Sequence, residues 1–533
     1  GRRNPSCASP DTGLMAVAAR VIPEGIHPRV AAKLYNARGD PGDKSGIIMS
    51  TSTRARPCAP SLSTFVPGAA STLALALGAA FNGNTMAAEL PVYIGAPIVV
   101  TSSRFEEPLG GQAANLTVIT RRQIEQNPAA TLPEILADYA GIGVRDLFGN
   151  NASNSTVDLR GFGAAAGQNT LILIDGRRLN DIDLSGVVWS ALPLSAIERV
   201  EVVRGGASVL YGPGAVGGVI NIITRSPLGK PNEASVALRA GSFATNDVQV
   251  YGNLAGKQMG ISLAANRHRS DGYRDNNQTR QESLYGDARW KSPSDELIFK
   301  FGVDKLDQRL PGARVVQPSI GLNQLATDRK GTSTPKDWAS RDGWQLGLTG
   351  NHKLAQGEAT VDLGYRNKKQ TSYFDFGGFP DFRISELDML SVSPRVKFLV
   401  DSGSVSHEWI VGLDLGRWDY DLRTSNAQAN IGRPINRVKA EQRNVGVYVR
   451  DQIQLNPALS VNLGARTEWF RIDAQDNYDA TAPGAFFGSG APDAQQRERE
   501  YAWEIGTRYR IAPSHVLYAK AGRSFRFATV DEI

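Results

Sequence analysis

AIERVEVVRGGASVLYGPGAVGGVINIITR, residues 196–225, is the stretch that decides the fold. It reads as a short amphipathic helix, a strand, a glycine-rich loop and a second strand. Gly212, Gly214 and Gly217 spell GxGxxG, the glycine spacing of dinucleotide-binding loops. Such a site needs a helix after the glycines, because its N-terminus holds the pyrophosphate. Residues 219–223 are instead a β-branched run that favours a strand, so the sequence disfavours a nucleotide site.

Several other phrases precede this stretch in order. They are PIVVTSSR (97–104), LTVITRRQIEQ (116–126), LPEILADYAGIGV (132–144), STVDLRGFG (155–163) and NTLILIDGRRLN (169–180). Their order and spacing resemble a complete plug domain of the TonB-dependent outer-membrane receptors, over about residues 96–228. Within that family, the plugs of cobalamin and ferric-siderophore receptors are the most similar. The resemblance implies an α+β plug, at 103–228, in the lumen of a barrel, with the glycine-rich loop packed against the wall where side chains do not fit.

Two local signals inside the expected plug predict the start of a helix and the position of a hairpin turn. Thr131 and Glu134 form a capping box that starts a helix, with Pro133 in its first turn. Asp175-Gly176, between LILI and RRLN, is a tight hairpin signal.

The charge balance gives no sign of a nucleic-acid partner, and we expect none. The chain has 59 basic and 53 acidic residues and a net charge of +6, but the first 87 residues hold nine of the basic and four of the acidic ones. The remainder is nearly neutral, so the basic character belongs to the leader. Both cysteines, Cys7 and Cys58, also lie there, which leaves no disulfide or thiolate metal site in the rest of the chain.

The leader predicts export. Residues 1–48 lack apolar periodicity and are interpreted as an upstream or disordered segment. Residues 49–87 carry arginines, an apolar run (73–81) and small residues before Ala88, which is typical of a secretory signal peptide. The apolar run is too short for a transmembrane helix. With the family resemblance, export implies the outer membrane of a Gram-negative cell.

Residues 229–533 alternate apolar and polar side chains with a period of two. Leu297, Phe299 and Phe301 oppose Lys300, for example, and Val445, Val447 and Val449 oppose Arg450 in the same way. A soluble β-sandwich alternates too, but aromatic residues near the segment ends and charges along whole polar faces favour a transmembrane barrel with a polar lumen.

The segments after the plug number about thirteen strands, whereas plugged transporters have ~22. We therefore expect a transmembrane antiparallel β-barrel that is incomplete, with the plug in its lumen and an open, C-shaped sheet. We also expect the chain to be truncated at its C-terminus, because it ends on Asp531-Glu532-Ile533 and not on a strand with a terminal aromatic residue.

Two polar loops match, by the resemblance, the plug apices that touch ligand in similar receptors. They span residues 149–155 and 180–189. The predicted ligand-binding residues are Asn150, Asn151, Asn154, Asp181, Asp183 and Trp189. Solvated turns are the alternative interpretation.

Related receptors hold their plugs with arginines paired to glutamates of the wall. Arg160 and Arg204 lie in plug phrases that should face the wall, and Glu468 and Glu504 are the expected partners. A charge buried at such an interface must be paired and hydrogen-bonded.

The periplasmic segment 88–102 contains the predicted TonB box, Ile98, Val99, Val100 and Thr101. An extended β-branched segment near a flexible N-terminus can add as a strand to a partner's sheet. The alternative is that these residues form the first strand of the plug.

These features predict an active importer that works with TonB and its inner-membrane complex. The expected ligand is a ferric siderophore, with cobalamin second; a passive porin or adhesin is the alternative from another class. The sequence contains no P-loop, GxSxG or HExxH, so we expect no enzyme and no cofactor. Asp473, Asp476 and Asp479 form an acidic cluster that is a weak calcium candidate.

Overall fold

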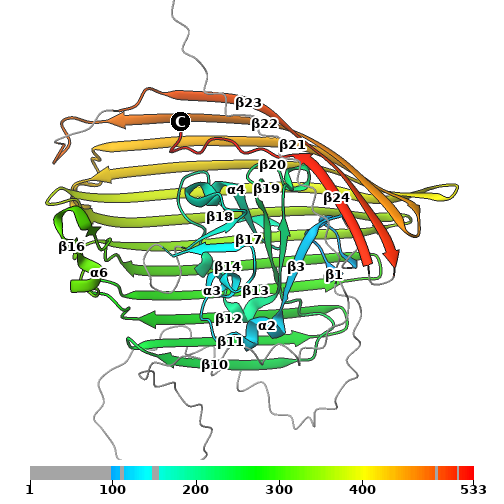
Figure 1. The fold of residues 1–533 in the computed structure, drawn as a ribbon, viewed down its shortest axis with the longest axis horizontal. Helices are drawn as coiled ribbons and strands as arrows, with labels where there is room; N and C mark the ends of the chain where they lie inside the picture. The colour runs from blue at the N-terminus through cyan, green and yellow to red at the C-terminus, as the bar shows by residue number, and fades with distance from the viewer. Residues whose placement is uncertain (1–97, 109–112, 147–154, 486–489, 513–514) are drawn as a thin grey trace, which may run out of the picture.

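The computed structural model describes residues 98–108, 113–146, 155–485, 490–512 and 515–533. A curved antiparallel sheet surrounds a smaller α+β domain, and Figure 1 shows that domain inside the arc of long strands. The predicted leader, residues 1–87, lies outside the described residues, so its assignment stays a prediction. No helix of the described part is long and apolar enough to cross a membrane.

The deciding stretch folds as its residue pattern predicts. Strand β8 (Ile197–Arg204) leads into the short helix α5 (Ser208–Tyr211), and the glycines lead into strand β9 (Gly218–Thr224). No helix N-terminus follows the glycines, so the nucleotide site is absent from this described stretch. Gly212 has a φ of 72°, and a Cβ there would lie 3.0 Å from Arg466 Nη2 and 3.2 Å from Glu468 Oε2 of the barrel. The glycine therefore lets the loop approach the wall.

The plug is built on a five-stranded sheet in the order β3-β8-β9-β6-β7. Its strands β6 and β9 are parallel, while the other neighbours are antiparallel. The sheet core is buried and apolar, and Tyr251 and Tyr285 of the barrel pack against the same cluster. The plug and the barrel thus share one hydrophobic core.

The elements of the plug are short. In chain order they are β1 (Ile98–Val99), β2 (Glu107–Pro108), β3 (Asn115–Thr120), α2 (Arg121–Gln126), α3 (Leu132–Ala137), β4 (Ile142–Arg145), β5 (Thr156–Leu159), η1 (Gly163–Ala165), α4 (Ala166–Asn169), β6 (Thr170–Ile174), β7 (Arg177–Arg178), η2 (Trp189–Ala191), η3 (Leu194–Ala196), β8, α5 and β9.

Both local turn signals are confirmed. Thr131 caps α3 in a complete capping box with Glu134. Asp175 and Gly176 both have positive φ, 48° and 81°, between the antiparallel β6 and β7. Two successive positive φ values define the type I′ turn that Asp-Gly favours.

The barrel sheet has thirteen strands, each paired antiparallel with its neighbours in sequence order. They are β10 (Glu233–Gly241), β11 (Thr245–Ala255), β12 (Met259–Ser270), β13 (Thr279–Lys291), β14 (Asp295–Arg309), β17 (Trp338–Leu354), β18 (Gly357–Asp375), β19 (Pro380–Ser402), β20 (Val405–Ser425), β21 (Asn436–Asn456), β22 (Leu459–Tyr478), β23 (Ala494–Ala512) and β24 (His515–Arg523). The connection before β17 holds β15 (Val316–Gln317), η4 (Pro318–Ile320), β16 (Leu322–Asn323) and α6 (Gln324–Thr327), and η5 (Gln428–Asn430) follows β20.

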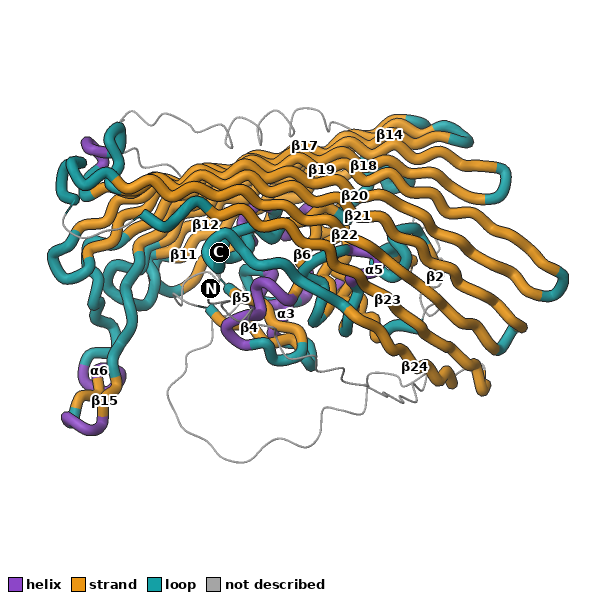
Figure 2. The backbone as a smooth tube through the Cα atoms, turned by 90° about the horizontal axis from the view of Figure 1, so that it is seen from above, coloured by secondary structure: helices purple, strands orange, loops and turns teal. Residues whose placement is uncertain are grey.

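The sheet is open, as the strand count predicts. β10 and β24 are the two ends of the hydrogen-bonded order and do not pair with each other in the described residues. Seen from above in Figure 2, the strands curve around one side of the plug elements without closing. The chain after β24 returns into the lumen, where Phe527 stacks on Phe470 with the ring centroids 4.3 Å apart.

Candidate functional site

The N-terminal segment, residues 98–104, is docked on the plug. β1 pairs with β2, and Val99 is buried. Thr101 donates from its backbone N and its Oγ1 to the Glu201 carboxylate, at 2.7 Å and 2.6 Å. Its Oγ1 also accepts from Asn221 at 3.1 Å, and its carbonyl accepts from the Tyr211 hydroxyl at 3.0 Å.

Glu201 holds this segment through a fully buried carboxylate on β8. Besides Thr101, it accepts from the backbone N of Val100 at 2.9 Å and is paired with Arg199 at 2.7 Å. A buried carboxylate must be paired and hydrogen-bonded, and these donors meet that demand. The Glu201 clasp, defined as Glu201 with Val100 and Thr101, therefore fixes the backbone of the last two residues of the predicted TonB box.

Arg104 joins the end of the segment to the barrel wall. Its Nη1 lies 2.9 Å from Asp414 of β20 and donates to the Tyr448 hydroxyl and to the Leu210 carbonyl, each at 3.0 Å. Burial alone lowers the pKa of Arg104, but Asp414 outweighs that effect and holds the pKa above its ordinary value. Arg104 and Asp414 form the N-terminal anchor.

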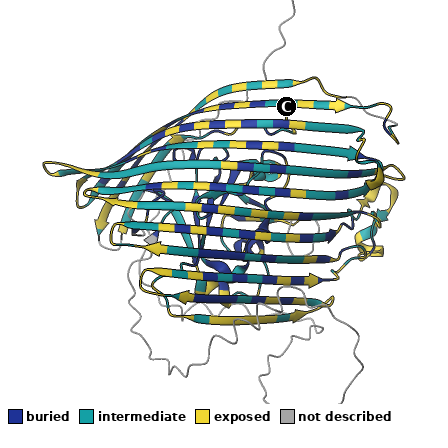
Figure 3. Ribbon diagram, turned by 180° about the vertical axis from the view of Figure 1, so that it is seen from behind, coloured by how far each residue is buried: buried dark blue, intermediate teal, exposed yellow. Residues whose placement is uncertain are grey.

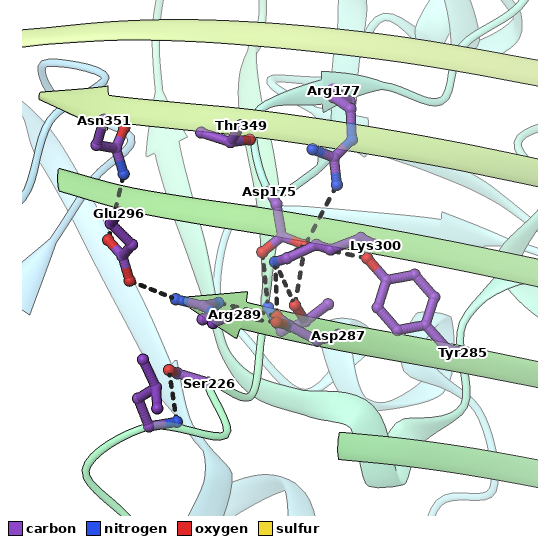
Figure 4. Close-up of polar contacts among 12 residues, drawn as sticks. Asp175, Arg177, Ser226, Tyr285, Asp287, Arg289, Glu296, Lys300, Thr349 and Asn351 are labelled. Atoms are coloured by element: carbon purple, nitrogen blue, oxygen red, sulfur yellow. Dashed lines mark hydrogen bonds and ion pairs between the residues drawn. The ribbon is translucent and has the colours of Figure 1, made fainter. Parts of the chain in front are cut away.

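A second anchor lies at the Asp-Gly turn of the plug. The Asp175 carboxylate is 2.7 Å from Lys300 Nζ of β14 and accepts from the Tyr285 hydroxyl of β13 at 3.2 Å. Lys300 also reaches Asp287, and Figure 4 shows these side chains converging between the plug turn and the wall. Burial alone raises the pKa of Asp175, but the Lys300 ammonium lowers it below the ordinary range. Asp175 and Lys300 form the turn anchor.

Asp181 forms a third anchor instead of an open ligand contact. Its side chain is buried and ion-paired with Arg366 and, at 2.6 Å, with Lys368, both on β18. These two cations outweigh the effect of burial and lower its pKa. Asp183 is also buried and lies 3.9 Å from Lys368, and its burial raises its pKa. We call Asp181 with Lys368 the loop anchor.

A cavity of about 90 Å³, called the apical cavity here, lies beside the loop anchor, between the plug and strands β20 and β21 of the barrel. It collects hydrogen-bonding side chains from the plug, from β20 and β21, and from the chain after β24. The polar and aromatic lining includes Gln168, Asn180, Asp181, Asp183, Trp418, Gln442, Asn444, Arg526 and Phe527. The arrangement offers both donors and acceptors beside an aromatic surface, which fits a polar ligand of mixed character.

The structure corrects the predicted arginine–glutamate pairs. Glu468 is paired with Arg466 at 2.5 Å, and Glu504 with Lys520 at 2.7 Å, all within the barrel. Arg204 donates to Thr117 and to the Ala140 carbonyl of its own domain. Glu468 and Glu504 therefore already have cations on their own and neighbouring strands.

Arg160, the other predicted arginine, is an exposed residue with a positive φ of 77°. Its guanidinium lies along Gly205, where a Cβ would be 3.1 Å from Nη2. It thus lies against the plug loop and not in a pair with Glu468 or Glu504.

The predicted ligand loops are only partly described. Asn150, Asn151 and Asn154 lie outside the described residues. Trp189 lies in η2 with its ring in the plug core, and its Nε1 donates to the Ser155 carbonyl at 2.7 Å. It is one of the residues that line the cavity, but it is only 8% exposed, because its ring packs in the plug core.

The predicted calcium cluster does not assemble. Asp473 and Asp476 lie on β22 and not in a loop, and Asp479 follows the strand. Asp473 binds Arg471, Asp476 binds Asn436, and Asp479 binds Arg433. An odd spacing along a strand sends side chains to opposite faces. In the described part of the chain, no three His, Cys, Asp or Glu side chains are grouped to hold a metal.

The comparisons with known proteins agree with this geometry. Residues 109–219 match the family model of the TonB-dependent receptor plug domain, and residues 269–533 match that of the TonB-dependent receptor-like β-barrel.

Among curated relatives, the vitamin B12 transporter BtuB of Vibrio vulnificus is 26% identical over 440 residues, which cover 82% of this chain and 64% of the relative. The BtuB of Photobacterium profundum is 33% identical over 159 residues, covering 30% of this chain and 25% of the relative. The chain thus spans less than two thirds of the length of these relatives.

Solved structures share the fold. The ferric citrate transporter FecA in its unliganded form superposes with a TM-score of 0.68 at 18% identity, over 79% of this chain and 64% of that one. The siderophore receptor PiuA from Acinetobacter baumannii gives a TM-score of 0.63 at 16% identity, over 78% and 65% of the two chains.

Proposed function

Because the chain belongs to the TonB-dependent receptors of the Gram-negative outer membrane, we propose that it is an active importer of a scarce external ligand. In this proposal the ligand binds between the plug apex and the barrel loops, and TonB pulls on the N-terminal segment. The plug then rearranges and releases the ligand inward. The observation that carries the proposal is the docked segment 98–104, which ends in an anchor to the barrel wall.

The segment Ile98, Val99, Val100 and Thr101 is the proposed TonB box. A partner can add a strand to these residues only after they leave β2 and the Glu201 clasp, since their backbone is engaged there. The segment would thus have two states, docked on the plug and released. TonB can act on the plug if it binds the released state and shifts the segment toward it.

The ligand side of the proposal rests on the apical cavity. Asp183 and Trp189 line it, and the loop with Asn150, Asn151 and Asn154 remains a proposed contact. Asp181 has its carboxylate neutralised by Arg366 and Lys368, so it orients the loop.

A ferric siderophore is the first proposed ligand. Cobalamin is the second, and a specific observation favours it, because the relative that covers 82% of this chain is a vitamin B12 transporter. Growth of a receptor-deficient strain on each ligand as sole source of iron or cobalamin, with the complete gene supplied, separates the two classes.

Backbone pairing with TonB makes a sharp test possible at Val99. Val99→Pro removes a backbone N–H and cannot continue a strand, whereas Val99→Ala keeps the backbone and changes only the side chain. We expect cells producing Val99→Pro receptor to bind labelled ligand at the surface but not to accumulate it, and Val99→Ala to transport. Equal transport by both variants would contradict coupling through this segment and favour a passive pore.

A further inference from the structure

The connections of the barrel define its outer end. At one end the strands are joined by short turns, such as 355–356, 403–404 and 457–458, and at the other by longer connections, such as 310–337 and 426–435. Outer-membrane barrels have short periplasmic turns and long external loops. Since β20 runs from the turn 403–404 to the loop 426–435, its residues after Arg417 lie toward the outside.

An apolar belt covers the outward face of the strands. Leu415, Val445 and Trp469 are cross-strand partners on β20, β21 and β22, and are 37%, 39% and 42% exposed. Along each strand, outward-facing residues alternate with residues that face the lumen, and Figure 3 shows this as alternating exposed and buried bands. Such exposed apolar rows face the acyl chains of the membrane.

Directly beyond the belt, four arginines stand in register across four strands. Arg417 of β20 is opposite Arg443 of β21, Arg443 is opposite Arg471 of β22, and Arg471 is opposite Arg497 of β23. All four are exposed on the outward face. Like charges directly opposite each other in a sheet are destabilising, so this arginine row needs anions beside it.

The protein supplies only part of the compensation. Asp419, Glu441 and Asp473 lie two residues beyond the first three arginines and pair with them. The fourth position is Gln495, so Arg497 has an amide neighbour and, among the described residues, no ion pair. The carboxylate oxygens of Asp419 and Asp473 accept from Nε and Nη2, which leaves the Nη1 donors of Arg417 and Arg471 outside these pairs.

Arg499 extends the surplus of positive charge toward the belt. It is the cross-strand partner of Trp469, and its guanidinium lies 5.2 Å from that ring. Tryptophan is enriched at the membrane–water interface, so the stack marks the level at which acyl chains give way to headgroups.

We propose that the arginine row, Arg417, Arg443, Arg471 and Arg497, binds the phosphate groups of a phosphorylated lipid in the outer leaflet. The guanidinium fork matches phosphate oxygens in pairs, and its remaining N–H groups are available at the surface. The row continues the lipid-facing belt, so a lipid can lay its chains on Leu415 and Val445 and its phosphate on the arginines at once. A soluble anion or a soluble protein would not contact the apolar belt and the arginine row together.

The same strands offer a matched control. Arg423 and Arg437 are also opposite each other on β20 and β21, face outward and pair with Asp421. They lie six residues beyond Arg417 and Arg443, which is about 20 Å farther along the strands. They share the charge and the carboxylate neighbour of the row, and are half-buried instead of exposed. They do not share the contact with the belt.

Native mass spectrometry of the full-length receptor in detergent tests the proposal. The receptor is mixed with equal amounts of a bis-phosphorylated acylated glucosamine disaccharide and its dephosphorylated form. The wild type and the R423Q/R437Q variant should bind the phosphorylated lipid about tenfold more than the other. The R417Q/R443Q variant keeps Arg471 and Arg497, so it should lose a clear part of this preference, at least about half of it. An unchanged preference in R417Q/R443Q, or an equal loss in R423Q/R437Q, would overturn the proposal.

Two further measurements on the wild-type receptor test lipid binding to the arginine row even if a variant fails to fold. The preference should fall as the ionic strength rises from about 0.05 to 0.5 M, because screening weakens exposed charge contacts. Inorganic phosphate at millimolar concentration should not displace the lipid, because it lacks the acyl chains. A salt-independent preference, or displacement by free phosphate, would contradict a lipid site at the membrane surface.

Discussion

At the scale of single residues, Arg104 attaches the plug to the wall through its pair with Asp414. Arg104→Ala and Asp414→Ala should be non-additive, because either change alone removes the pair. A double-mutant cycle on plug unfolding by denaturant should give a coupling energy of about 0.5–3 kcal/mol. Arg104→Ala combined with Asp175→Ala should be additive, since Asp175 pairs with Lys300 on another strand. An additive Arg104/Asp414 cycle would contradict the N-terminal anchor.

Glu201 should control access to the N-terminal segment. Glu201→Gln weakens the charge-assisted hydrogen bonds to Val100 and Thr101, each of which is worth about 1.5–3 kcal/mol. Labelling of a cysteine placed at residue 98 by a water-soluble maleimide should therefore become at least about tenfold faster. Glu198→Gln, on the same strand but paired with Lys230, should leave the rate unchanged. Equal rates in both variants would mean that the clasp does not hold the segment.

Individual partners were the hardest feature to predict from the sequence. The sequence places Arg104 and Asp175 in phrases typical of a plug, but nothing in it indicates that either residue contacts the barrel. Their partners Asp414 and Lys300 lie far along the chain, and alternation shows only that a side chain faces the lumen. The polar loop around Asp181 predicts a ligand contact, but the Asp181 carboxylate instead forms an ion pair with Lys368 of the barrel.

At the scale of elements, the glycine-rich loop between β8 and β9 sets the fit of the plug. Gly212→Ala adds a Cβ at a positive φ against Arg466 and Glu468, which should cost about 1–3 kcal/mol. Gly161→Ala is the control, because its φ is 79° but no atom lies within 4 Å of a Cβ there. Limited proteolysis should cleave the plug of Gly212→Ala faster than that of Gly161→Ala. Equal cleavage would show that backbone strain, and not the wall contact, is the whole effect.

Elements with local signals were predictable. The strand after the glycines, the capping box of Thr131 and the Asp175-Gly176 turn all depend on residues within a few positions of each other, so one sequence suffices. The 3₁₀ helix η2 carries no such signal. The sequence therefore predicts Trp189 in a loop that points away from the plug, whereas tertiary packing places its ring in the core.

At the scale of the whole molecule, the strand count was predictable because the period-two pattern persists over long strands; β19 alone has 23 residues. The relative placement of plug and wall was not, since it depends on contacts between distant segments. The open sheet has a testable consequence. Within the part of the chain that the structure describes, β10 and β24 each have one edge without a strand partner, and Val236 and Leu238 of β10 are 62% and 74% exposed.

Residues 88–533 expressed alone should therefore fail to give the compact, SDS-resistant species of closed barrels, because unpaired edges leave backbone groups unsatisfied in lipid. Electrophoresis of boiled and unboiled samples checks this. A faster-migrating band in the unboiled sample alone would mean that the sheet closes.

Uptake of labelled ligand by cells with and without TonB tests the central claim most directly. Cells carrying the complete gene and TonB should accumulate ferric siderophore or cobalamin above its external concentration. Isogenic cells lacking TonB should bind the ligand at the surface and accumulate none, because nothing releases segment 98–104 from the Glu201 clasp and the N-terminal anchor. Equal accumulation in both strains would contradict an energised importer.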